Sequence, residues 1–257
     1  MNQSERRQYL IRALLREQPR YRSMEIPADE KGQRDLLRAL MNVRQPAPIS
    51  DEYREVERVY LREATAEKGI VSLSDLSPVD GDLYLWQGDI TRLAVDAIVN
   101  AANSALLGCF QPLHYCIDNA IHTYAGLDLR NCCNEIMQKQ GHPEPTGQAK
   151  MTPGFNLPCQ YVLYTVGPIV SGFLNQQHCD QLASCYRACL TLAEENGCGS
   201  IAFCCISTGV FGFPKQEAAE IAVRTVKAYK QAHQSKIKVI FNVFRGDDFA
   251  TYRALLQ

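Results

Sequence analysis

The sequence predicts an α/β fold in three layers, with a central mixed sheet between helices and a helical extension at the N-terminus. From about residue 82 onward, short β-branched or apolar runs alternate with longer stretches of helical periodicity. This alternation is typical of a mixed or mainly parallel sheet that helices cover on both faces. Before about residue 75, the chain is rich in Arg and Glu, and its apolar residues recur at helical spacing.

Residues 1–75 form the predicted helical extension. Its three apolar stripes are Tyr9, Leu10, Ala13 and Leu14; Leu36, Leu37, Leu40 and Met41; and Tyr53, Val56, Val59 and Tyr60. Pro27 and the proline-containing segment 45–48 separate these stripes, because proline interrupts helices. We expect three amphipathic helices that dock on a larger domain formed by residues 76–257.

The larger domain is expected to alternate strands and helices along its length. Strands are predicted at residues 82–86, 97–100, 161–166, 201–206 and 239–244. Helical periodicity covers residues 115–140, 176–197, 214–232 and 247–256, with Pro214 in a first helical turn. Ligands of such sheets bind beyond the carboxyl ends of the strands, so the segments after the strands are the candidate functional positions.

Composition argues against several classes of function. A net charge of −1 over 257 residues gives no electrostatic case for nucleic-acid or membrane binding. The first seven residues lack the apolar region of a signal peptide, and no apolar run approaches the ~18 residues that span a bilayer. Eleven cysteines without an export signal, some of them adjacent in sequence, indicate free thiols and a cytoplasmic protein.

The segment 107–117 places Cys109, His114 and Cys116 within eight residues. Two thiolates and an imidazole are a ligand set that Zn²⁺ prefers, and three protein ligands leave one coordination position free for water or substrate. Gly108 and Pro112 keep the segment out of regular structure, so that it can fold around an ion. On spacing alone, a metal site and incidental thiols in a cysteine-rich chain are equally good interpretations.

Polar side chains follow the first two predicted strands. Asp89, followed by Ile90, can accept a hydrogen bond from an exocyclic amine such as that of adenine, or it can cap a turn. Asn100 and Asn103 come directly after a buried strand, where their amides need partners. These amides can bind sugar hydroxyls or stabilise local turns.

Two more stretches have ligand chemistry. In the segment 207–214, Gly209 and Gly212 allow the backbone to turn its N–H groups toward a diphosphate, and Phe211 can stack on a sugar. This turn matches neither common phosphate-binding motif, so alone it is weak. Asp118 is expected in the first turn of a helix beside the Cys/His segment, where capping is the ordinary role and catalysis the alternative.

Together these stretches resemble the macrodomain family, whose members bind ADP-ribose. The resemblance covers roughly residues 82–257 and rests on the order and spacing of the segments 87–91, 96–103 and 207–214, with residues 165–168 as a further strand end. It implies a three-layer macrodomain with a central mixed sheet between helices. It also implies that ADP-ribose, or a protein carrying it, is the ligand.

The resemblance assigns roles to single residues. Asp89 would receive the adenine amine, and Ile90 would contribute a backbone contact. Asn103 would hold the distal ribose, and Asn100 would support its loop. The diphosphate and distal ribose would be lined by Ser207, Thr208, Gly209, Val210 and Phe211. Asp118 stands where hydrolytic macrodomains carry an Asp, so Asn103 and Asp118 are the predicted catalytic residues.

The chain departs from most hydrolytic macrodomains at one place. Where they have a run of glycines, this chain has residues 108–116, which resemble the zinc-dependent macrodomains of bacteria and fungi. That resemblance implies that Cys109, His114 and Cys116 bind Zn²⁺, and it agrees with a long helical extension. Bacterial members are often encoded beside a sirtuin-type ADP-ribosyltransferase, so a protein modified by such an enzyme is the expected substrate.

The predicted function is zinc-dependent hydrolysis of the bond between mono-ADP-ribose and an acidic protein side chain. Two alternatives are a reader that binds ADP-ribose without cleaving it and a deacylase of O-acyl-ADP-ribose. A structural zinc, completed by a remote Cys or His, is a third. His122 is expected to pack or cap rather than bind metal, and Cys204 and Cys205 are expected to be inert in a buried strand.

Overall fold

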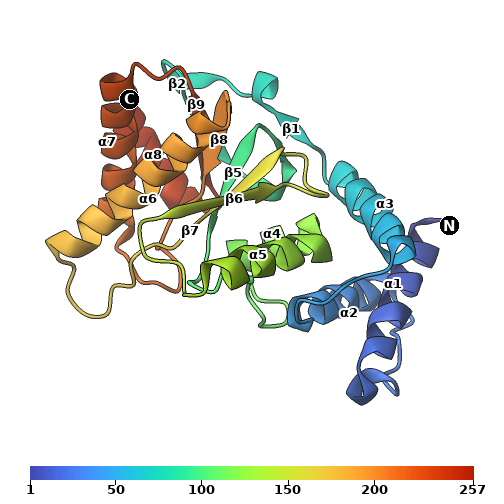
Figure 1. The fold of residues 1–257 in the computed structure, drawn as a ribbon. Coiled ribbons are helices and arrows are strands. Elements are labelled where there is room, and N and C mark those ends of the chain that lie inside the picture. Colours follow the sequence, from blue (N-terminus) through green and yellow to red (C-terminus); the bar gives the residue numbers. More distant parts are fainter.

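Five parallel strands form the centre of a seven-stranded sheet in the computed structural model, which describes all 257 residues. Their spatial order is β3 (Leu83–Gln87), β9 (Lys238–Val243), β8 (Ser200–Phe203), β5 (Ala97–Ala101) and β7 (Tyr161–Thr165). Antiparallel strands β2 (Pro78–Asp80) and β6 (Ala149–Pro153) form the two edges. The predicted mixed sheet is therefore confirmed (Figure 1).

Helices cover both faces of this sheet, as predicted. One face carries α4 (Ile117–Ala125) and α5 (Leu127–Gln140), and the other carries α6 (Gln176–Glu195), α7 (Lys215–His233) and α8 (Gly246–Leu256) (Figure 1). Parallel strands need crossover connections, and these crossovers are right-handed. A helix therefore lies on one face where the chain crosses the sheet in one direction, and on the other face where the chain crosses back. Forty-seven buried residues form one continuous core across these layers.

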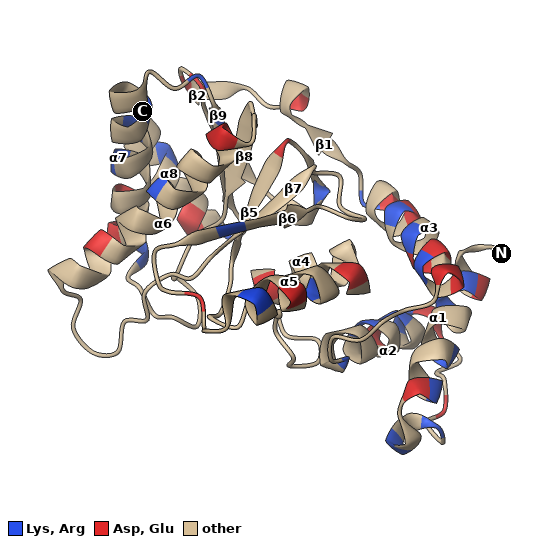
Figure 2. Cartoon of the chain, viewed as in Figure 1, with Lys and Arg blue, Asp and Glu red and all other residues tan.

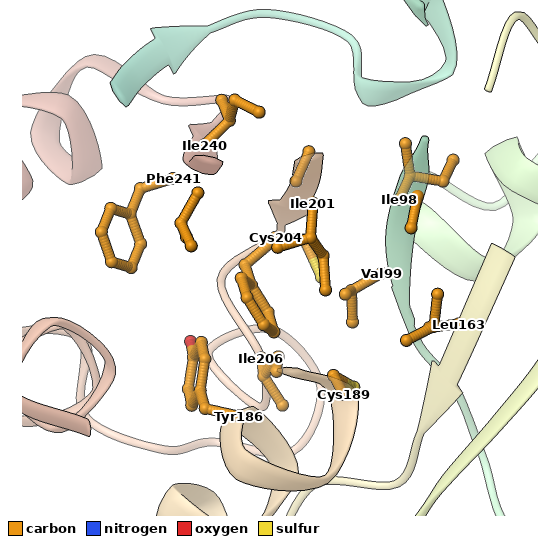
Figure 3. Packing of buried hydrophobic residues seen from close by; sticks show 14 of the residues in the cluster. Ile98, Val99, Leu163, Tyr186, Cys189, Ile201, Cys204, Ile206, Ile240 and Phe241 are labelled. Atoms are coloured by element: carbon orange, nitrogen blue, oxygen red, sulfur yellow. The ribbon is translucent and has the colours of Figure 1, made fainter. Parts of the chain in front are cut away.

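The centre of the core lies where β5, β7 and β8 meet α6. Ile98 and Val99 of β5 are fully buried, as expected for β-branched residues of a strand covered on both faces. They lie near Leu163 of β7 and Ile201 of β8 (Figure 3). This packing fixes the carboxyl ends of the strands, from which the candidate site is built.

The predicted helical extension consists of α1 (Gln3–Glu17), α2 (Glu30–Val43) and α3 (Asp51–Glu67), with a short 3-10 helix at Pro19–Tyr21. Each α-helix begins after a side-chain cap, at Asn2, Asp29 and Ser50, which accepts a backbone N–H of the first turn. Apolar residues of all three predicted stripes form a second core of twelve buried residues, to which the larger domain contributes only Leu127. Charged residues of both signs cover these helices, whereas the central strands carry few (Figure 2).

A two-residue parallel pair joins the extension to the larger domain. After α3, β1 (Val71–Ser72) pairs with β4 (Leu93–Ala94), and a 3-10 helix follows at Leu73–Asp75. The boundary between residues 75 and 76 stays a prediction. No helix of the chain combines the length and the apolar composition needed to cross a bilayer.

The helical periodicity predicted over 115–140 is confirmed, but it belongs to two helices, α4 and α5. The chain breaks at Gly126, whose φ of +90° belongs to glycine, and α5 starts at the next residue. A Cβ at position 126 would lie 2.5 Å from the Oε2 atom of Glu57 in α3. That carboxyl group accepts a hydrogen bond from the backbone N–H of Leu127 at 3.1 Å, so a side chain of the extension caps α5.

The prediction of a strand over 201–206 is wrong at its end. β8 ends at Phe203, the last residue that pairs with β9, and residues 204–206 lead into a turn where Ser207 has a left-handed φ of +65°. Cys204 is buried as predicted, but it lies after the strand, and burial raises the pKa of its thiol to about 12. The other predicted strands and helices agree with the structure to within two residues, and the short strands β1, β2, β4 and β6 were missed.

Candidate active site

The candidate site lies at the carboxyl edge of the sheet, where the five parallel strands end together. Asp89 follows β3, Asn100 and Asn103 lie at the end of β5, and residues 207–211 follow β8. Backbone hydrogen bonds connect the loops: the N–H of Ala102 donates to the carbonyl of Thr165 at 3.0 Å, and that of Val170 donates to the carbonyl of Phe211 at 2.8 Å. The predicted ligand-binding segments therefore share one edge.

Asp89 caps a 3-10 helix at Ile90–Arg92 and is charged. Its Oδ1 atom accepts the backbone N–H of Thr91 at 3.0 Å and the hydroxyl of Thr91 at 2.6 Å. Burial would raise the pKa of this carboxyl group, but the bonds from Thr91 and the charge of Lys68 outweigh burial and lower it. Asp89 can therefore cap the 3-10 helix and still carry the negative charge that would accept an adenine amine. Ile90, the next residue, is buried.

Lys68, which the sequence analysis missed, reaches Asp89 from the end of α3. Its Nζ atom lies 3.2 Å from Oδ2 of Asp89 and 3.5 Å from the ring centre of Tyr124 in α4. An exposed lysine at a helix end has no distinguishing sequence pattern. Only the fold brings it to the end of β3.

Asn100, Asn103 and Asp118 form a hydrogen-bonded group in which Asn100 and Asp118 are buried and Asn103 is half-buried. The amide of Asn100 donates to Oδ1 of Asp118 at 2.8 Å, and that of Asn103 donates to Oδ2 of Asp118 at 3.3 Å and to the carbonyl of Gly108 at 3.2 Å. Burial raises the pKa of Asp118 to about 6, against the opposing effects of the Asn100 amide and the charge of Arg130. Asp118 lies in the first turn of α4, as predicted.

His122 lies one helical turn after Asp118 and is buried. Its Nε2 atom is 3.5 Å from Oδ1 of Asp118, and neither ring nitrogen has a hydrogen-bond partner within the chain. Burial lowers the pKa of this imidazole to about 3, so the ring is neutral. A Cβ at Gly108 would lie 2.7 Å from the ring, so glycine is needed for this close approach. The predicted packing role of His122 is confirmed.

The side chains of Cys109, His114 and Cys116 converge, and the ligand atoms of all three lie within 4.8 Å of one another. The Sγ atom of Cys109 lies 3.5 Å from Nδ1 of His114. In a tetrahedral zinc site, with Zn–S near 2.3 Å and Zn–N near 2.0 Å, ligand atoms lie about 3.5–3.8 Å apart. The three donors therefore fit a soft divalent cation after small side-chain rotations.

Cys116 is also the N-cap of α4, where its Sγ atom accepts the backbone N–H of Asn119 at 3.4 Å. Burial raises the pKa of this thiol to about 12, and the N–H of Asn119 opposes that effect. A bound cation favours the thiolate, so metal binding at this position would release a proton. No further Cys, His, Asp or Glu joins the three-residue group.

The loop after β8 presents free backbone donors. The N–H groups of Gly209, Val210 and Phe211 make no hydrogen bond within the chain, and Val210 is exposed. The buried hydroxyl of Ser207 also has no partner. Successive free N–H groups at a glycine-containing turn are suited to an anion, which agrees with the predicted diphosphate contact.

Arg130 of α5, also missed by the sequence analysis, joins three segments beneath the site. Its Nε atom donates to the carbonyl of Leu107 at 2.8 Å, and its Nη1 atom donates to the carbonyls of Met41 and Arg44 at 2.8 and 2.5 Å. The guanidinium also lies 4.5 Å from the ring centre of Phe110. A buried arginine satisfied by distant carbonyls leaves no sequence signal.

Several known proteins are similar to this chain in sequence and in fold. The Macro domain family model matches residues 99–222. A protein-ADP-ribose hydrolase of Treponema medium is 58% identical over the whole length of both chains. A protein-ADP-ribose hydrolase of Staphylococcus aureus is 47% identical over 98% of this chain and 95% of that protein.

The Trypanosoma brucei macrodomain, whose crystal structure in complex with ADP-ribose is known, is 31% identical in sequence to this chain, and the two structures superpose with a TM-score of 0.67. The match covers 85% of this chain and 95% of that chain. The chain is similar to these relatives over nearly its full length, and it shares the fold of the macrodomain structure. The chain belongs to the Macro domain family, among relatives named protein-ADP-ribose hydrolases.

Proposed function

We propose that this chain is a zinc-dependent hydrolase that releases mono-ADP-ribose from modified side chains of proteins. The observation that carries the proposal is the position of Asn103. Its amide contacts both the buried carboxylate of Asp118 and the carbonyl of Gly108, which directly precedes the first metal ligand, Cys109. The amide expected to bind the distal ribose is thus next to the proposed metal centre.

In this proposal, ADP-ribose lies across the carboxyl edge of the sheet. Asp89 and the backbone of Ile90 bind the adenine, and Asn103, supported by Asn100, binds the distal ribose. The residues proposed to contact the diphosphate and ribose are Ser207, Thr208, Gly209, Val210 and Phe211. The negative charge of Asp89 and the free N–H groups of residues 209–211 support these assignments.

Cys109, His114 and Cys116 are the proposed ligands of Zn²⁺. A zinc ion with three protein ligands supplies an open position for a ribose hydroxyl or a water, and it lowers the pKa of that group. Asn103 and Asp118 are the proposed catalytic residues. Both oxygens of Asp118 accept asparagine amides, which favours a role in orienting Asn103, while its pKa of about 6 is compatible with a proton acceptor.

We extend the proposal to the substrate and its source. The resemblance of residues 108–116 to zinc-dependent macrodomains supports an acidic side chain as the modified residue, and a sirtuin-type ADP-ribosyltransferase as the enzyme that modifies it. We also propose a cytoplasmic location, which the many free thiols of the chain support. We propose no nucleic acid or membrane as a partner.

The test measures release of ADP-ribose from a mono-ADP-ribosylated protein, with the zinc content of each preparation determined alongside. Wild type is expected to contain about one zinc per chain. His114→Ala is expected to lose zinc and at least about 100-fold in activity, because both binding and the open position depend on this ligand. His142→Ala, at an exposed histidine, is the control that keeps both. Full activity of a zinc-free preparation would overturn the proposal.

The same experiment separates the alternative functions. A reader would bind ADP-ribose but release none from the protein, with or without zinc. A deacylase of O-acyl-ADP-ribose would cleave that ester and leave the modified protein intact. A structural zinc would make His114→Ala unfold, and circular dichroism of the variant detects this outcome.

A further inference from the structure

The loop that carries the metal ligands is held in place by α2 of the helical extension. The Nη2 atom of Arg38 donates to the backbone carbonyl of His114 at 3.1 Å. The same guanidinium donates to Oδ1 of Asn119 through Nε at 3.1 Å and through Nη2 at 2.7 Å. One side chain of the extension therefore contacts a ligand residue and the first turn of α4.

Asn119 extends this contact to the other two ligand residues. It is completely buried, and its Nδ2 atom donates to the carbonyl of Gln111 at 3.0 Å and to that of Cys109 at 3.5 Å. Its backbone N–H donates to the Sγ atom of Cys116 at 3.4 Å. Arg38 and Asn119 together thus contact all three of the proposed metal-ligand residues.

Asn42 makes a second, independent connection. It lies four residues after Arg38, so both side chains are on one face of α2. Its Oδ1 atom accepts the backbone N–H of Leu113 at 3.1 Å, and its Nδ2 atom donates to the hydroxyl of Thr123 in α4 at 3.0 Å. Leu113, which directly precedes His114, has a left-handed φ of +56°.

Contacts from outside the loop contribute to its shape because the loop has no regular secondary structure and few hydrogen bonds of its own. Residues 102–116 contain no helix or strand, and Leu106, Gly108 and Leu113 have positive φ angles. A non-glycine residue with positive φ is strained, and it persists only where its surroundings fix it. The surroundings of Leu113 include Asn42, a residue of the extension.

We propose that Arg38 and Asn42 are positioning residues for the metal centre, so that α2 is a working part of the site and not only a stabilising addition. This inference rests on the proposed function. Groups that orient the ligands of a metal without touching it typically change metal affinity about 10- to 100-fold when they are removed. The same size of effect is expected here for the loss of either hydrogen-bonding side chain.

The test compares Arg38→Met, which keeps the length of the side chain, with Arg34→Met as the matched control. Arg34 lies one turn earlier on α2, is exposed and pairs only with Glu30. Zinc affinity of the full chain is measured by competition with a chromophoric chelator, and the visible absorption of bound Co²⁺ reports the ligand geometry. Arg38→Lys should restore affinity only in part, because an ammonium cannot reproduce the bidentate bond to Asn119.

Arg38→Met is expected to bind zinc at least about tenfold more weakly than wild type, with an altered Co²⁺ spectrum, while Arg34→Met matches wild type. Asn42→Ala is the second variant, used in place of Arg38→Met if that protein fails to fold. Wild-type zinc affinity and an unchanged Co²⁺ spectrum in both variants would refute the positioning role alone. Absence of zinc binding by wild type would refute the proposed function as well.

Discussion

Oδ1 of Asn100 and the hydroxyl of Ser207, both at the carboxyl edge of the sheet, are among the buried polar atoms that have no partner within the chain. An unpaired buried polar group costs about 1–3 kcal/mol, and such groups often mark a functional site. Both residues belong to the proposed ADP-ribose site. A ligand hydroxyl or phosphate oxygen that bonds either atom would offset part of this cost, which couples ligand binding to stability.

Because Gly167 has no side chain, the hydroxyl of Ser207 can lie directly against it. A Cβ at position 167 would lie 2.0 Å from the Ser207 Oγ atom and 2.8 Å from Cγ2 of Ile206, which is closer than real Cβ contacts allow. Ser207 is held at a φ of +65°, so the loop after β8 has little freedom to move aside.

We therefore expect Gly167→Ala to displace Ser207 and to weaken ADP-ribose binding at least about tenfold, with about 1–3 kcal/mol of lost stability from overpacking. Isothermal titration calorimetry with ADP-ribose measures the affinity. Gly199→Ala is the control, because its Cβ would meet nothing closer than 3.5 Å. Equal affinities of the two variants would show that the close contact does not shape the binding loop.

At the scale of elements, the central strands and most helices were predictable because their signals are local. A buried parallel strand needs a run of apolar residues, and a polar residue marks that its end is near, as Asn100 does one residue before the end of β5. The polar residues of the site follow strand ends for the same reason, so Asp89, Asn100 and the 207–211 segment were found. The edge strand β6 contains Lys150 and ends at a proline, so its pattern is weak.

Contacts between distant segments explain what the sequence did not reveal. The break between α4 and α5 is fixed by Glu57, a residue 70 positions from Leu127. Arg38 and Asn42 lie on α2 and Lys68 directly follows α3, and both helices carry charged residues of both signs along their length (Figure 2). Only the docking of the extension shows that these three side chains reach the candidate site.

The contact between α3 and α5 predicts a pH dependence of stability. Burial raises the pKa of Glu57 to about 8 from its ordinary value of 4.5, with the Leu127 N–H as the main opposing effect. The folded state thus holds this proton at pH values where the unfolded chain releases it. The contribution of Glu57 is fully favourable below about pH 4.5 and is lost progressively as the pH rises toward 8.

Glu57→Gln removes this titration and retains an oxygen that can accept the Leu127 N–H. We expect the variant to gain stability over wild type as the pH rises from 5 to 8, by at least about 1.4 kcal/mol, the equivalent of one pKa unit. Urea unfolding at several pH values measures the difference. Glu55→Gln, at an exposed site on the same helix, should keep a constant difference from wild type between pH 5 and 8, because the ion pair with Arg58 lowers the pKa of Glu55. A constant difference between Glu57→Gln and wild type would contradict the raised pKa.

At the scale of the whole molecule, the extension and the larger domain have separate apolar cores but share buried polar contacts. Leu127 joins the core of the extension, and Glu57 caps α5. Arg130 donates to two carbonyls at the end of α2. Leu127 and Arg130 belong to the larger domain and find their partners in the extension, and Glu57 belongs to the extension and finds its partner in the larger domain. Each part therefore lacks some of its contacts without the other.

This arrangement predicts that residues 76–257 do not form an independent stable unit. Without residues 1–75, Leu127 is exposed, its N–H loses the carboxyl group of Glu57, and Arg130 loses two of its carbonyl acceptors. An unpaired buried donor costs about 1–3 kcal/mol, and more when it is charged, so these losses are a large part of a typical stability of about 5–15 kcal/mol.

We expect the truncated chain to unfold at a lower temperature than the full chain and to bind an apolar fluorescent dye, while the full chain unfolds in one transition. Differential scanning calorimetry of both proteins measures this. Glu63→Gln in the full chain, which removes only a surface ion pair between α1 and α3, is the control for changes within the extension. If residues 76–257 melted at the temperature of the full chain, the extension would be an independent domain, and the buried contacts across the boundary would contribute little.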